Sequence, residues 1–277
     1  MTGIAADPLD RLRARIARLG APLCLGIDPH PDALPDELPR DVSGIEQFAR
    51  GLVEAASEHV AAVKVNVAFF EAFGSAGWAA LERLVADLPS DQYLVLDAKR
   101  GDIGSTADRY AASLFGLLGA DAVTLSPYLG EDAIEPFLAY PGRVVYLLTR
   151  TSNPSAGTLQ DLPVGGMPLH EHVATWAAGQ WTDGRVGLVV GATAPAELAR
   201  LRRLAPALGF LVPGVGAQDG DLGAALAHCH GTAAPGLVSI SRAIAAASRG
   251  DGWRAAAAAS AQSWLGRMQE AGATLPV

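Results

Sequence analysis

Lysine is nearly absent from this chain of 277 residues, which has nineteen arginines but only two lysines, Lys64 and Lys99. Wherever the protein needs nothing more than a positive charge, it uses arginine. An ammonium group can donate a proton and is a compact charge, whereas a guanidinium group keeps its proton. Both lysines lie in apolar, strand-like runs, AAVKVNVAFF and YLVLDAKRGD. We therefore expect each lysine to have a role that arginine cannot fill.

Other scarcities exclude whole classes of protein. The two cysteines, Cys24 and Cys229, are too few for a disulfide framework, which fits a reducing cytoplasm. No apolar run approaches the roughly 18 residues of a membrane span. Residues 1–20 lack the apolar core of a signal peptide and resemble a short amphipathic helix. The net charge of −8 argues against nucleic acid or an anionic membrane as a partner.

The chain does contain a regular alternation of strand-like and helical segments. Eight short apolar runs are predicted strands: Leu23–Asp28, Val60–Val67, Tyr93–Lys99, Ala122–Ser126, Arg143–Thr149, Val186–Gly191, Phe210–Val215 and Gly236–Ser241. Strands without polar alternation indicate a parallel sheet buried on both faces. Eight βα units in about 250 residues is the number found in a (β/α)8 barrel.

We therefore predict an α/β fold, a TIM barrel formed by a single domain over residues 1–277. A doubly wound open sheet is the alternative fold. It is weakened because no G-x-G-x-x-G motif follows the first predicted strand.

One connection differs from the others. Thr151–Pro168 (TSNPSAGTLQDLPVGGMP) follows the fifth predicted strand, is rich in Gly, Pro, Ser and Asn, and has no clear period. A loop of this length in a compact domain is usually functional or disordered. Because it would hang over the mouth of the barrel, we interpret it as a lid.

Polar residues collect at the carboxyl ends of the predicted strands, where barrels place their chemistry. Asp97 and Lys99 stand two apart on one strand and should both point into the mouth. Lys64 comes from the neighbouring strand, while Gly101 turns the chain and frees Asp102 to point elsewhere. Buried charges persist only when they are paired. Two interpretations stay open: a catalytic cluster of alternating charges, or ion pairs that only fix a strand end.

The cluster favours some reactions over others. A Schiff-base lysine needs a depressed pKa, whereas the acids around Lys99 favour its ammonium form. We expect Lys99 to act as a proton donor. Mg²⁺ held by Asp97 and Asp102 is an alternative, since carboxylates suit hard cations. Two lysines already neutralise these carboxylates and would repel a metal, so we expect no metal. The sequence also offers no obvious support for a thiamine or pyridoxal site.

A phosphate site is indicated by the loops after the seventh and eighth predicted strands, PGVGAQDGD and SISRAI. These two loops are the usual phosphate grip of a barrel. Gly214 and Gly216 allow close backbone approach, Gln218 offers an amide, and Arg242 offers a fork for phosphate oxygens.

The segment Asp97–Ala111 (DAKRGDIGSTADRYA) resembles the signature of the orotidine 5′-phosphate decarboxylase family. The agreement continues in order through LCLGIDPHP, KVNVAFFEAFG, SPYLG, TRTSNPSA, VVGATAP, VPGVGAQDGD and SRAI, and several of these strings are similar to the longer bacterial (type 2) subgroup. The resemblance implies a cofactor-free, homodimeric, cytoplasmic barrel. Its reaction would convert orotidine 5′-phosphate to uridine 5′-phosphate and CO₂, the last step of de novo UMP synthesis.

The resemblance also implies roles for the charged residues. Lys99 matches the proton donor, and Asp97 matches the carboxylate beside the substrate carboxyl group. Lys64 matches the lysine that bonds the ribose and bridges to Asp97. Asp102 and Thr106 match residues that reach into the active site of the partner subunit.

Other matches are substrate contacts: Asp28 for the ribose, Ser152 for the pyrimidine, and Pro213, Gln218, Ser241 and Arg242 for the phosphate. One position departs from the family pattern. Val65 follows Lys64 where many members have proline, which bears on local backbone stiffness and leaves the catalytic set intact.

Three rival functions remain open. They are a Mg²⁺-dependent sugar-phosphate decarboxylase or aldolase on a related barrel, a Schiff-base aldolase, and a non-catalytic nucleotide-binding barrel. The charge cluster argues against the last, because a mere binder gains nothing from an aspartate beside an anionic ligand.

Overall fold

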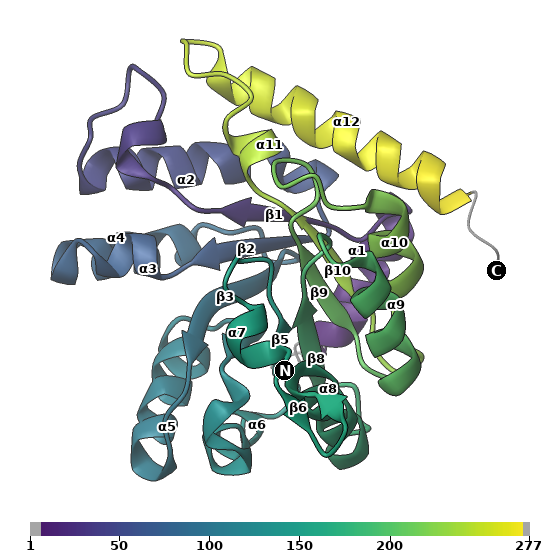
Figure 1. Cartoon of the computed structure of the whole chain (residues 1–277). Coiled ribbons are helices and arrows are strands. Elements are labelled where there is room, and N and C mark those ends of the chain that lie inside the picture. Colours follow the sequence, from purple (N-terminus) through teal and green to yellow (C-terminus); the bar gives the residue numbers. More distant parts are fainter. Residues whose placement is uncertain (1–6, 274–277) are drawn as a thin grey trace, which may run out of the picture.

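A closed barrel of eight parallel strands forms the centre of the protein (Figure 1). The structure is a computed structural model and describes residues 7–273. Around the barrel the strands follow the order β1-β10-β9-β8-β5-β4-β3-β2. They are β1 (Leu23–Ile27), β2 (Ala62–Asn66), β3 (Tyr93–Arg100), β4 (Ala122–Leu125), β5 (Val144–Arg150), β8 (Val186–Val190), β9 (Phe210–Pro213) and β10 (Leu237–Ile240).

All eight predicted strands are present, and closure of the sheet confirms the TIM barrel over the doubly wound alternative. Observed strand ends differ from the predicted ones by one or two residues because burial continues beyond the hydrogen-bonded ladder. Val60 and Val67, for example, are fully buried but flank β2. That the domain extends over all of 1–277 stays a prediction, since residues 1–6 and 274–277 lie outside the described part.

Helices surround the barrel on its outer side (Figure 1). They are α1 (Pro8–Leu19), α2 (Val42–Ala56), α3 (Ala68–Glu71), α4 (Gly74–Ala86), α5 (Gly104–Ala111), α6 (Glu135–Leu138), α7 (Gly157–Gln160), α8 (Leu169–Gln180), α9 (Pro195–Leu204), α10 (Leu222–Cys229), α11 (Arg242–Ala245) and α12 (Trp253–Ala273). A π-helical turn, η3 (Ala112–Leu117), extends α5. Four 3₁₀ turns complete the set: η1 (Pro31–Ala33), η2 (Ser57–His59), η4 (Pro127–Leu129) and η5 (Glu131–Ala133).

Alternate strand residues build two apolar layers. One set, which includes Val63, Leu96 and Val123, packs against the helices. The other set fills the barrel and includes the buried rings of Tyr93 and Tyr146. Burial on both faces is what the unbroken apolar runs predict.

Helix α1 closes the amino end of the barrel. Its buried residues Leu9 and Leu12 belong to the same apolar cluster as the barrel interior. The helix begins where the Asp7 carboxylate accepts a hydrogen bond from Leu9 N and ends at Gly20, whose φ of 67° suits glycine. This confirms the amphipathic helix predicted near the start of the chain, and it leaves the carboxyl ends of the strands as the open mouth.

The segment interpreted as a lid, residues 151–168, is more regular than its sequence suggests. It contains the four-residue helix α7 and an antiparallel hairpin of β6 (Pro163–Val164) and β7 (Met167–Pro168). Elements of four and two residues are too short to create a visible period, which explains the prediction of an irregular loop. Gly165 and Gly166 turn the hairpin with φ of 60° and 88°.

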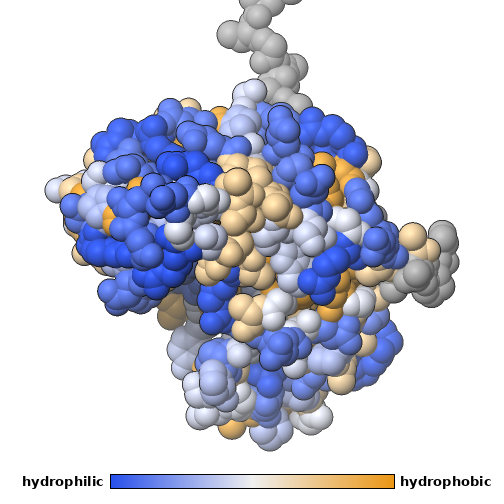
Figure 2. All heavy atoms as spheres, turned by 90° about the horizontal axis from the view of Figure 1, so that it is seen from above, coloured by the Kyte–Doolittle hydropathy of each residue, from blue (hydrophilic) through white to orange (hydrophobic). Residues whose placement is uncertain are grey.

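The face of the molecule seen in Figure 2 is mainly hydrophilic. Figure 2, which views the molecule from above relative to Figure 1, shows hydrophilic residues over most of that face and hydrophobic residues in small groups. Across residues 7–273, no helix has the length and apolar character that a membrane span requires.

Candidate active site

A cavity of about 530 Å³ opens at the mouth of the barrel, beside the carboxyl ends of β1, β2, β9 and β10. Six of the predicted site residues line it: Asp28, Lys64, Pro213, Gln218, Ser241 and Arg242. The structure therefore brings together residues that lie far apart in the sequence.

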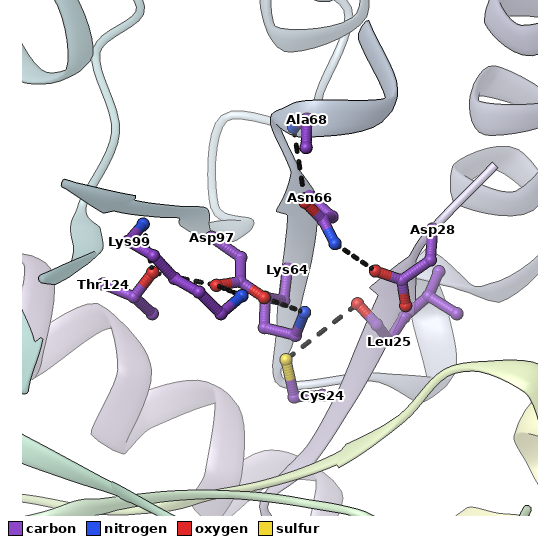
Figure 3. Close-up of polar contacts among 9 residues, drawn as sticks. All are labelled: Cys24, Leu25, Asp28, Lys64, Asn66, Ala68, Asp97, Lys99 and Thr124. Carbon is purple, nitrogen blue, oxygen red and sulfur yellow. Dashed lines mark hydrogen bonds and ion pairs between the residues drawn. The ribbon is translucent and has the colours of Figure 1, made fainter. Parts of the chain in front are cut away.

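Lys64 and Lys99 share the carboxylate of Asp97 (Figure 3). Lys64 Nζ lies 2.8 Å from Asp97 Oδ2, and Lys99 Nζ lies 2.6 Å from Asp97 Oδ1. Thr124 adds a third contact, since its hydroxyl donates to Asp97 Oδ1 at 2.8 Å. The Lys64 and Asp97 side chains are 7% and 11% exposed, whereas the Lys99 side chain is 48% exposed. The buried carboxylate is thus fully paired, and Lys99 keeps one side open to the mouth.

Mutual attraction fixes the charge of this cluster. Burial opposes ionisation of Asp97, but Lys64 and Lys99 outweigh it and hold the pKa of the Asp97 carboxyl well below its ordinary value. Burial likewise opposes the charge on Lys64, but Asp97 and Asp28 outweigh it and raise the pKa of that amine. Beneath Lys64, burial raises the pKa of the Cys24 thiol to about 12, so this sulfur is a neutral thiol and not a nucleophile.

An irregularity in β3 brings Lys99 back to Asp97. The register with β4 shifts between Leu96 and Arg100, and Lys99 has a left-handed backbone with φ of 48°. The Lys99 N–H leaves the regular ladder and donates to Thr124 Oγ1 at 3.0 Å. The two side chains meet as predicted, although the predicted cause, simple alternation along a strand, is incomplete. Thr124 was not predicted; its signal is one hydroxyl in the apolar run AVTLS.

Asp28 is oriented by a neighbour on β2. Asn66 Nδ2 donates to Asp28 Oδ1 at 3.0 Å, and Asn66 Oδ1 accepts from Ala68 N at 3.3 Å (Figure 3). Its side chain thereby joins the end of β1 to the start of α3. Both Asp28 and Asn66 line the cavity. Asn66 is a functional candidate to which the sequence analysis assigned no role.

The far end of the cavity has little side-chain bulk and a free guanidinium group. Gly214 and Gly216 have φ of 102° and 88°, a region that favours glycine. A side chain at Gly26 would collide with the hydroxyl of Ser241, so that glycine lets β10 approach β1 closely. Arg242 is exposed and forms no ion pair with any residue of 7–273, which leaves its donors available to an anion.

Five predicted residues are not among those that line the cavity. Asp97 and Lys99 adjoin it through the ion pair of Asp97 with Lys64. The other three are Asp102, Thr106 and Ser152. Asp102 accepts a hydrogen bond from Ile103 N at 2.8 Å, and no contact joins it to Asp97 or Lys99. Thr106 is exposed on α5, and Ser152 lies across the mouth from Lys64, packed on Gly191. The chain by itself therefore assembles part of the predicted site.

Val65, the departure from the family pattern, is fully buried and lies in register between Ile27 of β1 and Leu96 of β3. It is accommodated as an ordinary strand residue between the two elements that carry Asp28 and Asp97.

The closed barrel and the paired charges at its mouth define a TIM-barrel enzyme. A family model described as orotidine 5′-phosphate decarboxylase / HUMPS family matches residues 21–258, and the chain belongs to this family. It is 53% identical over 243 residues to an orotidine 5′-phosphate decarboxylase from Roseiflexus castenholzii, covering 87% of this chain and 89% of that one. A relative of the same name from Delftia acidovorans is 44% identical over 275 residues, and the alignment covers 96% of this chain and 98% of that one.

Solved structures agree. The OMP decarboxylase of Leishmania donovani superposes with a TM-score of 0.81 at 41% identity, covering 95% of this chain and 99% of that one. The expected fold and family are therefore confirmed over nearly the whole length.

Proposed function

We propose that this protein decarboxylates orotidine 5′-phosphate to uridine 5′-phosphate and CO₂, the last step of de novo UMP synthesis. The observation that carries the proposal is the Lys64–Asp97–Lys99 cluster, a buried carboxylate between two ammonium groups. Relatives that share about half of the sequence bear the name of this activity.

The chemistry requires a proton donor at one carbon atom. When the bond between C6 and the carboxylate breaks, its electron pair stays on C6 and CO₂ leaves. The Lys99 ammonium stabilises this developing charge and then transfers a proton to C6, regaining a proton from solvent. Asp97 lies beside the substrate carboxylate, repels it before the reaction, and is relieved as CO₂ departs. The balance needs no metal and no organic cofactor.

Binding at the phosphate end supplies energy far from the reacting carbon. Arg242, Gln218 and the backbone near Pro213 hold the phosphate, with Ser241 beside them. Asp28 and Lys64 bind the ribose. Closure of the 151–168 segment brings Ser152 to the pyrimidine. The energy of phosphate binding drives this closure and thereby stabilises the transition state.

The active unit is a homodimer in the cytoplasm. Asp102 has no contact with Asp97 or Lys99 of its own chain, and Thr106 is exposed on α5, which fits a role in the site of the partner subunit. Both cysteines are free and buried, which fits a reducing compartment.

The Mg²⁺-dependent alternative has less support. Asp97 already has two ammonium partners, and Asp102 does not approach it, so the two carboxylates do not converge as ligands. Turnover by the purified protein should therefore be unaffected by a chelator.

The test is an ultraviolet assay of orotidine 5′-phosphate loss, run with and without EDTA and with Lys99→Ala as the inactive control. We expect chelator-independent turnover that the variant lacks. No turnover by the wild type would overturn the proposal, and loss of turnover with EDTA would favour the metal-dependent alternative. Trapping of a substrate adduct by borohydride would instead indicate a Schiff-base enzyme.

A further inference from the structure

The start of the 151–168 segment is attached to the barrel mainly through polar contacts. Helix α7 buries none of its residues, and Leu159 is 47% exposed. A second cavity of about 480 Å³ lies between α7, α8 and the ends of β4 and β5. Apolar packing therefore contributes little to the position of α7, and its hydrogen bonds become decisive.

One side chain makes several of these polar contacts. Gln160, the last residue of α7, closes a ring with Thr151, the first residue after β5. Thr151 N donates to Gln160 Oε1 at 2.9 Å, and Gln160 Nε2 donates to Thr151 Oγ1 at 2.7 Å. The Thr151 hydroxyl then donates to Asn153 Oδ1 at 2.6 Å. Because a backbone N–H can only donate, this ring fixes which end of the Gln160 amide faces Thr151.

The main chain of Gln160 is held separately. The buried ring of His170 places Nδ1 2.9 Å from the Gln160 carbonyl oxygen, and Leu169 N donates to Leu162 O at 2.8 Å. A substitution of the Gln160 side chain should therefore leave α7 attached to α8. It would remove only the contacts of the carboxamide, which are those to Thr151 and a longer hydrogen bond from Arg150 Nη1 to Gln160 Oε1 at 3.4 Å.

The residue that follows Thr151 is Ser152. A Cβ atom on Gly191 would lie 3.1 Å from Ser152 Cβ, so Ser152 rests directly on the end of β8. Gly191 N also donates to Arg150 O at 2.8 Å. Ser152 is thus supported by Gly191 on one side, and through Thr151 by Gln160 on the other.

We propose that Gln160 is a positioning residue, whose carboxamide fixes Thr151 and thereby aims Ser152 at the pyrimidine of the substrate. The inference rests on the proposed function, in which Ser152 contacts that ring. Gln160 itself touches no reacting atom, so its effect should be confined to ligands that carry a base.

The first experiment compares Gln160→Met with the wild type. The variant keeps the side-chain length and loses the two hydrogen bonds to Thr151 and the longer one from Arg150. The value of kcat/KM for orotidine 5′-phosphate should therefore fall about tenfold, the factor expected for one to two hydrogen bonds. Inhibition by uridine 5′-phosphate should weaken, while inhibition by ribose 5-phosphate, which lacks the base, should not change. Gln180→Met is the matched control, because Gln180 is an exposed helix residue bonded to Glu131. Thr151→Val removes the hydroxyl contacts of the ring, keeps the hydrogen bond from Thr151 N, and should reproduce part of the loss.

The second experiment is a double-mutant cycle with Ser152→Ala. If Gln160 acts through Ser152, adding Gln160→Met to Ser152→Ala should lower kcat/KM by less than about twofold more. Independent, additive losses would overturn the inference, as would equal weakening of both inhibitors or unchanged kinetics in Gln160→Met. Absence of turnover in the wild type would instead overturn the proposed function, so the two failures are distinct.

Discussion

Lys99 Nζ lies 2.6 Å from Asp97 Oδ1 although the backbone of Lys99 is left-handed, with φ of 48°. A non-glycine residue in this region costs roughly 1–2 kcal/mol, and such strain concentrates at functional sites. At Lys99 the strained backbone turns a half-exposed ammonium group toward a buried carboxylate. Several expected outcomes depend on this pair and its neighbours.

Replacement of Lys99 should abolish turnover and leave the fold intact, since the Lys99 side chain is half exposed. Lys99→Ala removes the proton donor. Lys99→Arg should fail nearly as badly, because guanidinium does not give up its proton. The assay is decarboxylation by both variants beside a binding titration with uridine 5′-phosphate. Substantial activity in Lys99→Arg would contradict proton donation by Lys99.

The strain at Lys99 predicts an order of stability between two inactive variants. Glycine adopts positive φ without steric cost, so Lys99→Gly should be more stable than Lys99→Ala by about 0.5–1 kcal/mol. At an ordinary position the order would be reversed. Urea unfolding of the two variants measures the difference, and a more stable Lys99→Ala would show that the left-handed backbone is not strained.

Acid should destabilise the protein partly through Asp97. In the folded state the pKa of Asp97 lies below its ordinary value. The stability that Asp97 contributes is therefore complete above its pKa in the unfolded state, and it is lost as the pH falls through its pKa in the folded state. We expect the free energy of unfolding to drop more steeply below about pH 5 in the wild type than in Asp97→Asn. Urea midpoints across this range test the difference, and parallel curves would mean that Asp97 is not the group responsible.

The proposed sharing of active sites between two subunits predicts complementation. Lys99→Ala and Asp102→Ala proteins should each be inactive alone. Mixed dimers should recover activity, because one of their two sites would keep both residues intact. Failure of re-formed mixed dimers to recover would mean that Asp102 serves its own chain.

Removal of Arg242 should affect phosphorylated ligands selectively. Arg242→Ala should lower kcat/KM for orotidine 5′-phosphate. The loss should correspond to about 1.5–3 kcal/mol of transition-state stabilisation, as expected for hydrogen bonds to a charged group. The nucleoside orotidine has no phosphate, so its reaction should be spared. An equal fall for both substrates would show that Arg242 shapes the site generally, and the phosphate assignment would have to be withdrawn.

Most of the barrel could be predicted because its signals are local. An uninterrupted apolar run predicts each strand, and eight such runs predict the closed barrel that the structure has. The residues around Asp97 could be predicted for a related reason: parallel strands end at one rim, so polar residues that follow them must meet.

What could not be predicted depends on tertiary context. The bulge that turns Lys99 and the role of Thr124 arise from a register shift between β3 and β4, which no single segment encodes. The short helix and hairpin of residues 151–168 have no period to read, and the ring between Thr151 and Gln160 joins residues nine positions apart in a segment without apparent pattern. Asp102 could be matched to a role but not located by sequence, and in the structure it accepts a hydrogen bond from Ile103 N without contacting Asp97 or Lys99.

The scarcity of lysine has a practical use in spectroscopy. Both lysines of the chain contact the same carboxylate. A sample labelled with ¹⁵N at lysine alone would therefore give two side-chain ammonium signals, each from the mouth of the barrel and neither from the rest of the surface. Such a sample reports ligand binding and proton transfer at the site without any engineered probe.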